Sequence, residues 1–280
     1  IMSKYNCQQD YFEKIDTEEK AYWLGFLYAD GYVRIGKRNS GQLKLKLSTK
    51  DKGHIKLFKE CISSTHPVVD GIDKVIKNNR EYISYSSTFN VYSRKMVDDL
   101  ISHGCLNNKT FKIRMPNIDI EFIRHFIRGY FDGDGCIHKN KSRPNSFSVV
   151  ICSNNDFIED ISNLFKIGFI TKKKNYSLLT INKIDYIKEF REFIYKDSSI
   201  FLNRKHDIFG EIIDNYKRGS ISGKNYRLVD PNGVEFITNR LKSFCNDNNL
   251  VYSSISNLLR GIGKTNKKWT CEVIKNIKIK

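Results

Sequence analysis

The chain has 280 residues, of which 48 are Lys or Arg and 31 are Asp or Glu, so its formal net charge at neutral pH is +17. This length allows two or three modules with cores of their own. The charge favours a polyanionic partner, most often nucleic acid, over a basic protein that has no such partner.

Cysteine usage and hydropathy indicate the compartment. The seven cysteines are scattered, and none has the C-x-x-C spacing of a zinc site, so we expect reduced thiols. No N-terminal segment resembles a signal peptide, and the longest apolar run, Ala21 to Ala29, is too short to span a bilayer. We expect a protein of the cytoplasm of a prokaryotic or phage-infected cell, or of an organellar matrix, without membrane contact.

The first hundred residues predict the order helix, two strands, helix, two strands, helix. The predicted segments are a helix capped by Asp16 with Glu19 and ending at Asp30, strands at Tyr32–Ile35 and Leu43–Ser48, a helix at Lys52–Cys61, strands at Val68–Ile76 and Tyr82–Tyr92, and a helix at Lys95–His103. Gly31 is expected to end the first helix in a left-handed conformation. The second strand alternates leucines with Lys44 and Lys46, which predicts one buried and one basic face.

The same order begins again near residue 117. The predicted segments are a helix capped by Asn117 and spanning Phe122–Asp134, strands at Cys136–His138 and Phe147–Cys152, a helix at Asp156–Phe165, strands at Phe169–Lys172 and Ser177–Asn182, and a helix at Ile184–Phe193. Asp134 follows Asp30 by 104 residues, and Lys205 follows Lys109 by 96 within two similar Leu-Asn-x-x segments. Two landmarks at nearly one spacing predict an internal duplication.

Two segments repeat one pattern. Residues 23–31 are WLGFLYADG and residues 127–135 are IRGYFDGDG, each an apolar helix that ends in an acid and a glycine. A helix that is apolar on every side must be buried, so we expect the two copies to pack together through small residues spaced four apart. These interface residues are Gly25, Ala29, Gly129 and Gly133.

The predicted helix contact would bring Asp30 and Asp134 side by side. Each carboxylate would lie at the negative end of its helix dipole and would repel the other. A divalent cation removes this conflict, and Mg²⁺ typically takes one or two carboxylates and completes its shell with water and phosphate. The alternative is that each Asp-Gly pair is only a helix end followed by a turn.

WLGFLYADG and IRGYFDGDG resemble the two motifs of a double-motif LAGLIDADG homing endonuclease, and the resemblance covers about residues 10–215. Both keep the eighth-position acid, whereas Tyr28 stands where Asp132 keeps the sixth-position acid. The resemblance implies a monomeric α+β protein whose two pseudo-symmetric αββαββα halves form a saddle over double-stranded DNA. It implies Mg²⁺- or Mn²⁺-dependent cleavage of both strands across the minor groove, with short 3′ overhangs, at a long target of an intron-encoded mobile element. The difference between Tyr28 and Asp132 leaves preferential nicking of one strand as an alternative.

The family often places a lysine near the metals late in each half, and Lys109 and Lys205 match that position. Such a lysine would stabilise charge on the phosphate or orient the attacking water. The expected catalytic residues are Asp30, Asp134, Lys109 and Lys205, with the two acids as metal ligands. Lys50 and Asn154 are weaker candidates for ordering water.

The basic strand faces are expected to contact DNA. Most of these side chains would touch phosphates, while Arg34 is the best candidate to pair with guanine. The expected contacts in the two halves are Arg34, Lys37, Arg38, Lys44, Lys46, Lys50, Lys139, Lys141 and Arg143.

The remaining residues predict a second unit. We expect halves at 1–112 and 113–216, a linker at 217–224, and a C-terminal DNA-binding module at 225–280. The module's predicted elements are a hairpin at Tyr226–Val229 and Val234–Phe236, a helix-turn-helix pair at Thr238–Asn246 and Ser253–Leu259, and a strand at Trp269–Ile274. It is similar to nuclease-associated modules, with Ser254, Asn257 and Arg260 as DNA contacts. The alternative is a cap that packs on the core or binds protein.

Two other functions are compatible with the sequence. The same scaffold could serve as a group I intron maturase that binds intron RNA, or as a DNA-binding regulator that has lost cleavage. Neither function needs the acids, so the presence of both Asp30 and Asp134 favours the nuclease.

Overall fold

The computed structural model describes residues 5–36, 39–77, 80–106, 113–139, 146–215, 225–260 and 268–274. The chain divides into two compact units, Ile1–Asp214 and Asn215–Lys280. The predicted linker at 217–224 lies outside the described residues. Among the helices that are described, none has the length and apolar character needed to cross a membrane.

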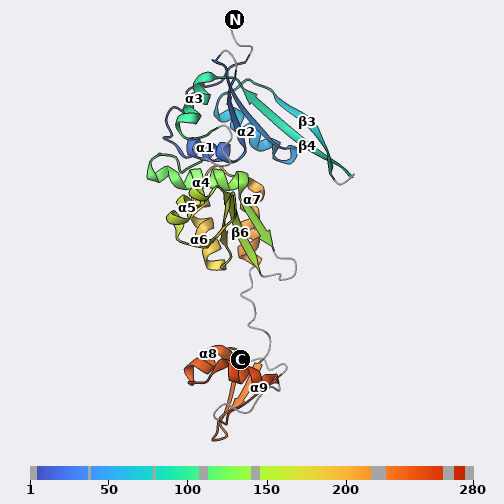
Figure 1. Cartoon of the computed structure of the whole chain (residues 1–280), viewed down its shortest axis with the longest axis vertical. Helices are drawn as coiled ribbons and strands as arrows, with labels where there is room; N and C mark the ends of the chain where they lie inside the picture. Colours follow the sequence, from blue (N-terminus) through green and yellow to red (C-terminus); the bar gives the residue numbers. More distant parts are fainter. Residues whose placement is uncertain are drawn as a thin grey trace. The chain divides into compact units, whose positions relative to one another are not determined.

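The N-terminal unit has an α+β fold that repeats one order of elements (Figure 1). The first copy consists of α1 (Glu18–Asp30), β1 (Gly31–Ile35), β2 (Gly41–Ser48), the 3-10 helix η2 (Thr49–Asp51), α2 (Lys52–Cys61), β3 (Val68–Lys77), β4 (Arg80–Val91) and α3 (Arg94–Ser102). The second consists of α4 (Ile120–Asp134), β5 (Cys136–Lys139), β6 (Phe147–Ser153), α5 (Asn155–Phe165), β7 (Phe169–Lys172), β8 (Ser177–Ile181) and α6 (Ile184–Tyr195), followed by α7 (Asn203–Asn215). Both antiparallel sheets have the same topology, β1-β2-β4-β3 and β5-β6-β8-β7.

Helices cover one face of each sheet. In β2 the three leucines are buried, while Lys44 and Lys46 belong to the opposite face, as the alternation predicted. We call that opposite face the open face. In the first sheet it carries Tyr32, Arg34, Gln42, Lys44, Lys46, Ser48, Ser84, Ser86, Thr88 and Asn90, and along the outer strand pair also Val69, Gly71, Asp73, Val75 and Tyr82. In the second sheet it carries Cys136, His138, Ser148, Val150, Cys152, Phe169, Thr171, Leu178 and Thr180.

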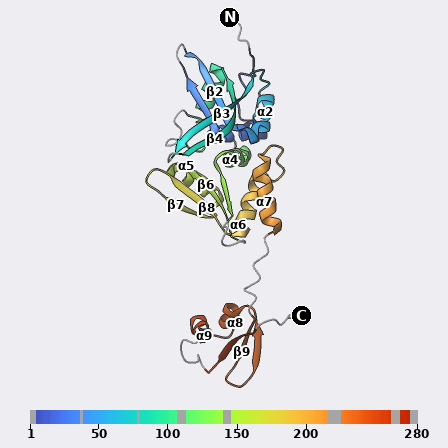
Figure 2. The same cartoon turned by 90° about the vertical axis from the view of Figure 1, so that its right-hand side faces the viewer.

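Helices α1 and α4 pack against each other in the middle of the unit, with one sheet on each side of the pair (Figures 1 and 2). Their backbones touch at glycines. A Cβ atom on Gly25 would overlap the carbonyl oxygen of Phe126, and one on Gly129 would overlap a carbonyl oxygen of α1. One on Gly133 would overlap the methyl group of Ala29. No larger side chain fits at these glycines without moving a helix backbone.

Gly31 does not adopt the left-handed conformation that we expected. Its φ of −74° and ψ of 147° are extended, because β1 starts directly after α1 without an intervening turn. Glycine is still required at this position for steric reasons, since a Cβ atom would lie 2.6 Å from the carbonyl oxygen of Leu27.

The predicted cap residues are wrong at both helix starts. Thr17 rather than Asp16 caps α1, and Asp119 rather than Asn117 precedes α4.

A buried carboxylate joins the two halves. Asp132 is fully buried and accepts hydrogen bonds from the hydroxyls of Tyr195 and Tyr22, at 2.5 and 2.9 Å, and from the backbone N–H of Leu202, at 2.7 Å. Burial raises the pKa of Asp132 against the lowering effect of these donors. The Tyr22 hydroxyl also lies 2.8 Å from Nε2 of His54, which requires the hydrogen of the neutral ring to be on Nε2.

A buried cation forms a second link. The guanidinium of Arg128 has no solvent exposure and donates to the carbonyl oxygens of Ile200 and Ile194, to Nδ1 of His125 and to the carboxylate of Glu18. The Glu18 contact is 2.6 Å long and reaches the first turn of α1. Breaking such a pair leaves a buried charge without a partner, so these contacts fix α4 against α1.

His54 makes the stability of this unit dependent on pH. Burial, with a further contribution from Arg204, lowers the pKa of His54 from 6.5 to about 4. Between these values the unfolded chain binds the proton and the folded chain does not, so stability falls as the pH falls from 6.5 to 4. We expect this residue alone to remove about 3 kcal/mol of unfolding free energy across the window. Urea denaturation at several pH values should show a shallower dependence in His54→Gln; identical curves for the two proteins would contradict the prediction.

The C-terminal unit is a three-stranded antiparallel sheet with two helices. Its elements are β9 (Asn225–Val229), β10 (Glu235–Thr238), α8 (Leu241–Asp247), α9 (Tyr252–Leu259) and β11 (Thr270–Ile274), and the strand order is β10-β9-β11. The core contains Leu228, Leu241, Cys245, Leu250 and Ile255. The predicted hairpin, two helices and last strand are present, but Thr238, the expected start of the first helix, is the last residue of β10 instead. The turn between the helices contains Asn249 with φ of 53°, in the role that glycine often takes in helix-turn-helix connections.

Candidate functional site

Asp30 and Asp134 end the two central helices. Each is the last residue of its helix, α1 or α4, and each is exposed. A carboxylate oxygen of Asp30 lies 3.3 Å from the point where a Cβ on Gly133 would stand, directly before Asp134. The close glycine contact therefore brings the two acids to one place between the sheets.

The electrostatic environment supports this proximity. The charges of both acids act on Lys205, and both contribute to the raised pKa of Tyr130, whose largest cause is burial. Both carboxylates also lie where the helix dipole is negative. The site therefore accumulates negative charge at neutral pH, which a cation would offset.

Lys205 closes the end of α4. Its side chain is buried, and Nζ donates to the carbonyl oxygens of Phe131, Gly133 and Gly135 at 2.7, 3.0 and 2.6 Å. These bonds use all three hydrogens of the ammonium group. Burial lowers the pKa of Lys205 to about 8, while the charges of Asp132, Asp30 and Asp134 oppose that shift. Lys205 thus satisfies the last carbonyls of the helix that carries Asp134.

The sixth positions of the two motifs lie in the interior. Asp132 is in the buried cluster described above, and the buried Tyr28 donates its hydroxyl to the carbonyl oxygen of His103. The difference between Tyr28 and Asp132 is therefore a difference in core packing. It does not alter the exposed acid pair, and it gives no support to preferential nicking.

The donor set suits Mg²⁺ or Mn²⁺. Within the described ranges, no cluster of three or more His, Cys, Asp or Glu side chains is arranged to hold a metal ion. Hard cations do not need such a cluster, because a pair of carboxylates with water and phosphate is sufficient. A pocket beside Asp134, lined by residues of both halves that include Ala29, Tyr130 and Cys152, gives room for these further ligands.

The open face of the first sheet is polar and basic beside the acids. Strand β1 starts at the residue after Asp30, and it carries Arg34, which is exposed. Lys44 lies with its ammonium 5.2 Å from the centre of the Tyr32 ring. Gln42 donates to the side-chain oxygen of Asn90 at 3.2 Å. These groups offer both cationic and amide contacts to a bound polyanion.

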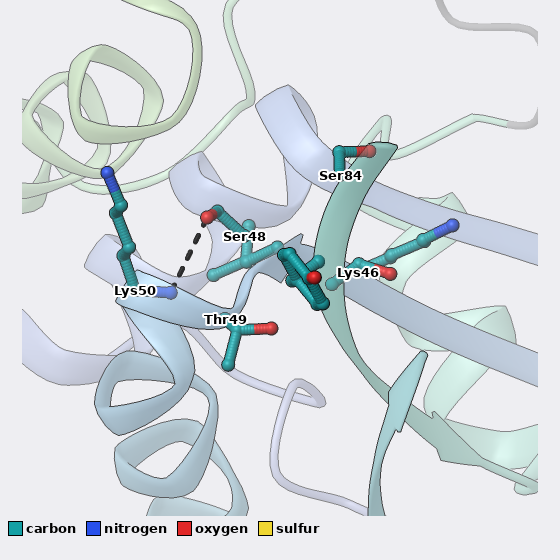
Figure 3. A pocket seen from close by; sticks show the side chains of 8 residues that line it. Lys46, Ser48, Thr49, Lys50 and Ser84 are labelled. Carbon is teal, nitrogen blue, oxygen red and sulfur yellow. Dashed lines mark hydrogen bonds between the residues drawn. The ribbon is translucent and has the colours of Figure 1, made fainter. Parts of the chain in front are cut away.

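A pocket lies where β2 ends against β4. Figure 3 shows Lys46 and Lys50 on opposite sides of this pocket, with the hydroxyls of Ser48, Thr49 and Ser84 between them. The backbone N–H of Lys50 donates to the Ser48 hydroxyl at 3.4 Å. Ammonium and hydroxyl groups in this arrangement suit a phosphate oxygen.

Lys46 has an internal counter-charge. Its ammonium is 2.6 Å from a carboxylate oxygen of Asp73, and the Ser86 hydroxyl donates to the other oxygen at 2.7 Å. These two contacts lower the pKa of Asp73. Sequence patterns do not predict this pair, because the two residues lie on non-adjacent strands.

Replacing Asp73 by Asn should strengthen the binding of a polyanion such as duplex DNA to this face. Without Asp73 as its partner, the Lys46 ammonium can contact a phosphate. We therefore expect the affinity for a duplex at fixed salt to rise by about three- to tenfold, and the slope of log affinity against log salt concentration to become steeper by up to about one. Asp70→Asn is the matched control, because Asp70 pairs with Lys52 of α2 and its replacement removes the same charge. Titrations of a duplex at several salt concentrations measure both effects; equal gains in the two variants would show that only net charge matters.

The second sheet differs from the expectation. Lys139 is exposed but pairs across the strands with the buried Phe147, with its ammonium 6.0 Å from that ring, so it belongs to the helix-covered side. Alternation along a short strand could not show this, because the apolar pattern of β5 is weak. Several expected site residues lie outside the described residues: Lys37, Arg38, Lys109, Lys141 and Arg143.

Asn154 has a structural role instead of the water-ordering role that we considered. Its side-chain oxygen caps α5 by accepting from the N–H of Phe157, and its amide nitrogen donates to the carbonyl oxygen of Ile113, both at 2.9 Å.

The sequence analysis also missed the role of Arg128 as a buried cation that links α4 to α1. A charged residue inside a helix predicted to be buried on every side was the available signal, since a buried charge needs partners.

The exposed side of α9 is polar. Ile255 faces the core, whereas Ser253, Asn257 and Arg260 are exposed and Ser254 is half-buried. On the sheet, Arg227 is neutralised by Glu235 and by Glu272. Within the described part of this unit, α9 therefore presents polar side chains that are not engaged in those ion pairs.

Comparisons with known proteins give three results. Residues 121–195 match the family model of the LAGLIDADG-like domain, and this segment contains Asp134. The chain is 28% identical over 177 residues to the replication factor C small subunit of Methanocaldococcus jannaschii, a match that covers 61% of this chain and spans 8% of that protein's length.

Solved structures with a similar arrangement include the LAGLIDADG meganuclease I-AabMI bound to uncleaved DNA and the LAGLIDADG homing endonuclease I-LtrWI bound to target DNA. The first is 13% identical with a TM-score of 0.46 and covers 70% of this chain and 89% of that one. The second is 15% identical with a TM-score of 0.46 and covers 76% and 92%.

Proposed function

We propose that the chain is a site-specific DNA endonuclease with two LAGLIDADG motifs that cuts both strands of a long target. The observation that carries the proposal is the joint position of Asp30 and Asp134 at the ends of two helices in backbone contact. The LAGLIDADG-like match over residues 121–195 and the charge of +17 support it.

In this proposal Asp30 and Asp134 hold divalent cations, Mg²⁺ or Mn²⁺. Bound cations supply Lewis-acid activation of the attacking water and neutralise the leaving oxygen. The two carboxylates hold them between the sheets, where each strand of a duplex can present a phosphate. Lys205 fixes the end of α4 through three carbonyl bonds and so positions Asp134. Lys109 remains a proposed catalytic residue of the first half.

The duplex would lie along both open faces. We propose halves at residues 1–112 and 113–216 within one monomer. Because the two acids are close together, the cuts on the two DNA strands would be close together as well, and the 3′ overhangs of the product would be short. Arg34, Lys44, Lys46 and Lys50 would contact the DNA from the first half, and Lys37, Arg38, Lys141 and Arg143 remain proposed contacts. Lys139 is no longer one of them, because it lies on the helix-covered side of the second sheet. Intron RNA binding by a maturase, or DNA binding without cleavage, is the competing function.

A selection for cleaved sites tests the function. The full chain is incubated with a random duplex library and Mg²⁺, and linear products are sequenced. We expect one long site to be enriched, with the cuts on the two strands a few base pairs apart and no cutting in EDTA. Binding to a site without cleavage would identify a regulator, and binding only to structured RNA would identify a maturase.

We further propose that residues 225–280 form a second DNA contact through α9. Arg260→Ala should then weaken binding to all duplexes, while Asn257→Ala should relax base preference beyond the cleaved core. Lys242→Ala on α8 is the control for charge. Measured affinities on the selected site should fall by about threefold or more for Arg260→Ala and stay unchanged for Lys242→Ala; equal effects would argue for a role as a cap or protein contact.

A further inference from the structure

The two open faces differ in chemistry although their sheets share one topology. Cross-strand pairing defines equivalent positions, because Lys44 lies opposite Tyr32 on β1 just as Val150 lies opposite Cys136 on β5. By the same register, Lys46 is opposite Thr88, and Cys152 is opposite Leu178. The second sheet therefore has a valine and a cysteine where the first has two lysines.

No lysine or arginine belongs to the open face of β5, β6, β7 and β8 as far as those strands are described. Lys139 lies on the helix-covered side, and Lys172 pairs with Glu159 of α5 on that same side. The face instead combines exposed or half-buried apolar groups with hydroxyls and one imidazole, His138. Its apolar members are Cys136, Val150, Cys152, Phe169 and Leu178.

A duplex placed on the acid pair meets both faces. Strand β1 leaves Asp30 directly, and β5 leaves Asp134 after a single glycine, so each open face starts beside its acid. In the major groove, apolar side chains contact the methyl group of thymine, whereas arginine and amide side chains pair with guanine and adenine. Each face can therefore recognise only the base edges that its side chains match.

We propose that the endonuclease recognises an asymmetric target in which the half-site on the second sheet is rich in thymine and is selected through its methyl groups. The half-site on the first sheet is selected through hydrogen bonds to purine edges by Arg34, Gln42 and Asn90. This inference rests on the proposed function and specifies its substrate. It also implies that most of the contacts between the sheets and DNA phosphates are made by the first half.

Replacement of thymidine by deoxyuridine tests the proposal, because it removes the methyl group and keeps the pairing edge. The half-site on the first sheet is identified as the one whose base preference relaxes in Arg34→Ala. Binding of the full chain to the selected site is measured in EDTA with deoxyuridine in one half or the other. We expect a loss of about fourfold per contacted methyl in the second half-site and less than about twofold in the first.

A pair of valine variants assigns the effect to the sheet. Val150→Ser should remove the share of the deoxyuridine sensitivity that one methyl contact contributes, about fourfold, whereas Val69→Ser, an exposed valine of β3 on the open face of the first sheet, should leave the sensitivity of the second half-site unchanged. Equal deoxyuridine effects in both half-sites, or full sensitivity in Val150→Ser, would overturn the inference while leaving the endonuclease intact. Failure to select any cleaved site would overturn the proposed function itself.

Discussion

Asp30→Asn and Asp134→Asn proteins are expected to bind the selected duplex with unchanged or higher affinity and to cut both strands far more slowly. Each substitution keeps the shape of the side chain and removes one of the two charges that would hold divalent cations. Cleavage should fall by about 100-fold or more, equivalent to about 3 kcal/mol of transition-state stabilisation. Single-turnover assays with each strand labelled separately measure the effect on both cuts.

Thermal unfolding gives this prediction a second readout. Two carboxylates at the negative ends of adjacent helices destabilise the protein when no cation is bound, so each variant should unfold at or above the wild-type temperature in EDTA. Mg²⁺ should stabilise the wild type and have little effect on the variants. Asp185→Asn, an exposed acid in the first turn of α6, is the control for charge. Full cleavage by either acid variant would show that the acids do not hold the catalytic cations.

Gly129→Ala is expected to destabilise the N-terminal unit by about 3 to 5 kcal/mol, as is Gly25→Ala. The added methyl group would overlap a backbone carbonyl oxygen of the facing helix in each case, and a backbone cannot rotate away as a side chain can. Relief requires α1 and α4 to separate, which also moves the acids apart. Chemical denaturation measures the loss, and Mg²⁺-dependent cleavage should fall with it.

The chain contains matched controls for this effect. Gly53 in α2 and Gly210 in α7 are helical glycines at which an added Cβ would have no contact within 4 Å beyond its own helix backbone and chain neighbours, among the described residues. Because alanine has the better helix propensity, Gly53→Ala and Gly210→Ala should stabilise the protein by about 0.5 to 1 kcal/mol. A similar loss in all four variants would contradict the account based on helix contact.

Local patterns were sufficient for most of the fold. The strict alternation of β2, the repeated apolar helices and the turn Pro231-Asn232-Gly233 between β9 and β10 each depend on neighbours along the chain, and the corresponding elements are confirmed. The helix caps failed because several polar residues compete within one turn, and only the final geometry selects Thr17 over Asp16.

Residues whose roles depend on distant segments could not be predicted. The partners of Lys46, Asp132 and Arg128 include residues of other strands, helices and loops far along the chain, so no spacing rule predicts them. Lys205 shows the same limit. Its position in the sequence matched a family pattern, but its three bonds to the end of α4 follow only from the packing of α7.

The bonds of Lys205 set an order of events during synthesis. The helix that ends in Asp134 emerges from the ribosome about seventy residues before the lysine that satisfies its last carbonyls. A nascent or truncated chain that ends before α7 therefore leaves those carbonyls unsatisfied and the second acid loosely held. In the proposed endonuclease, the position of the second acid would therefore be fixed only once α7 has been made.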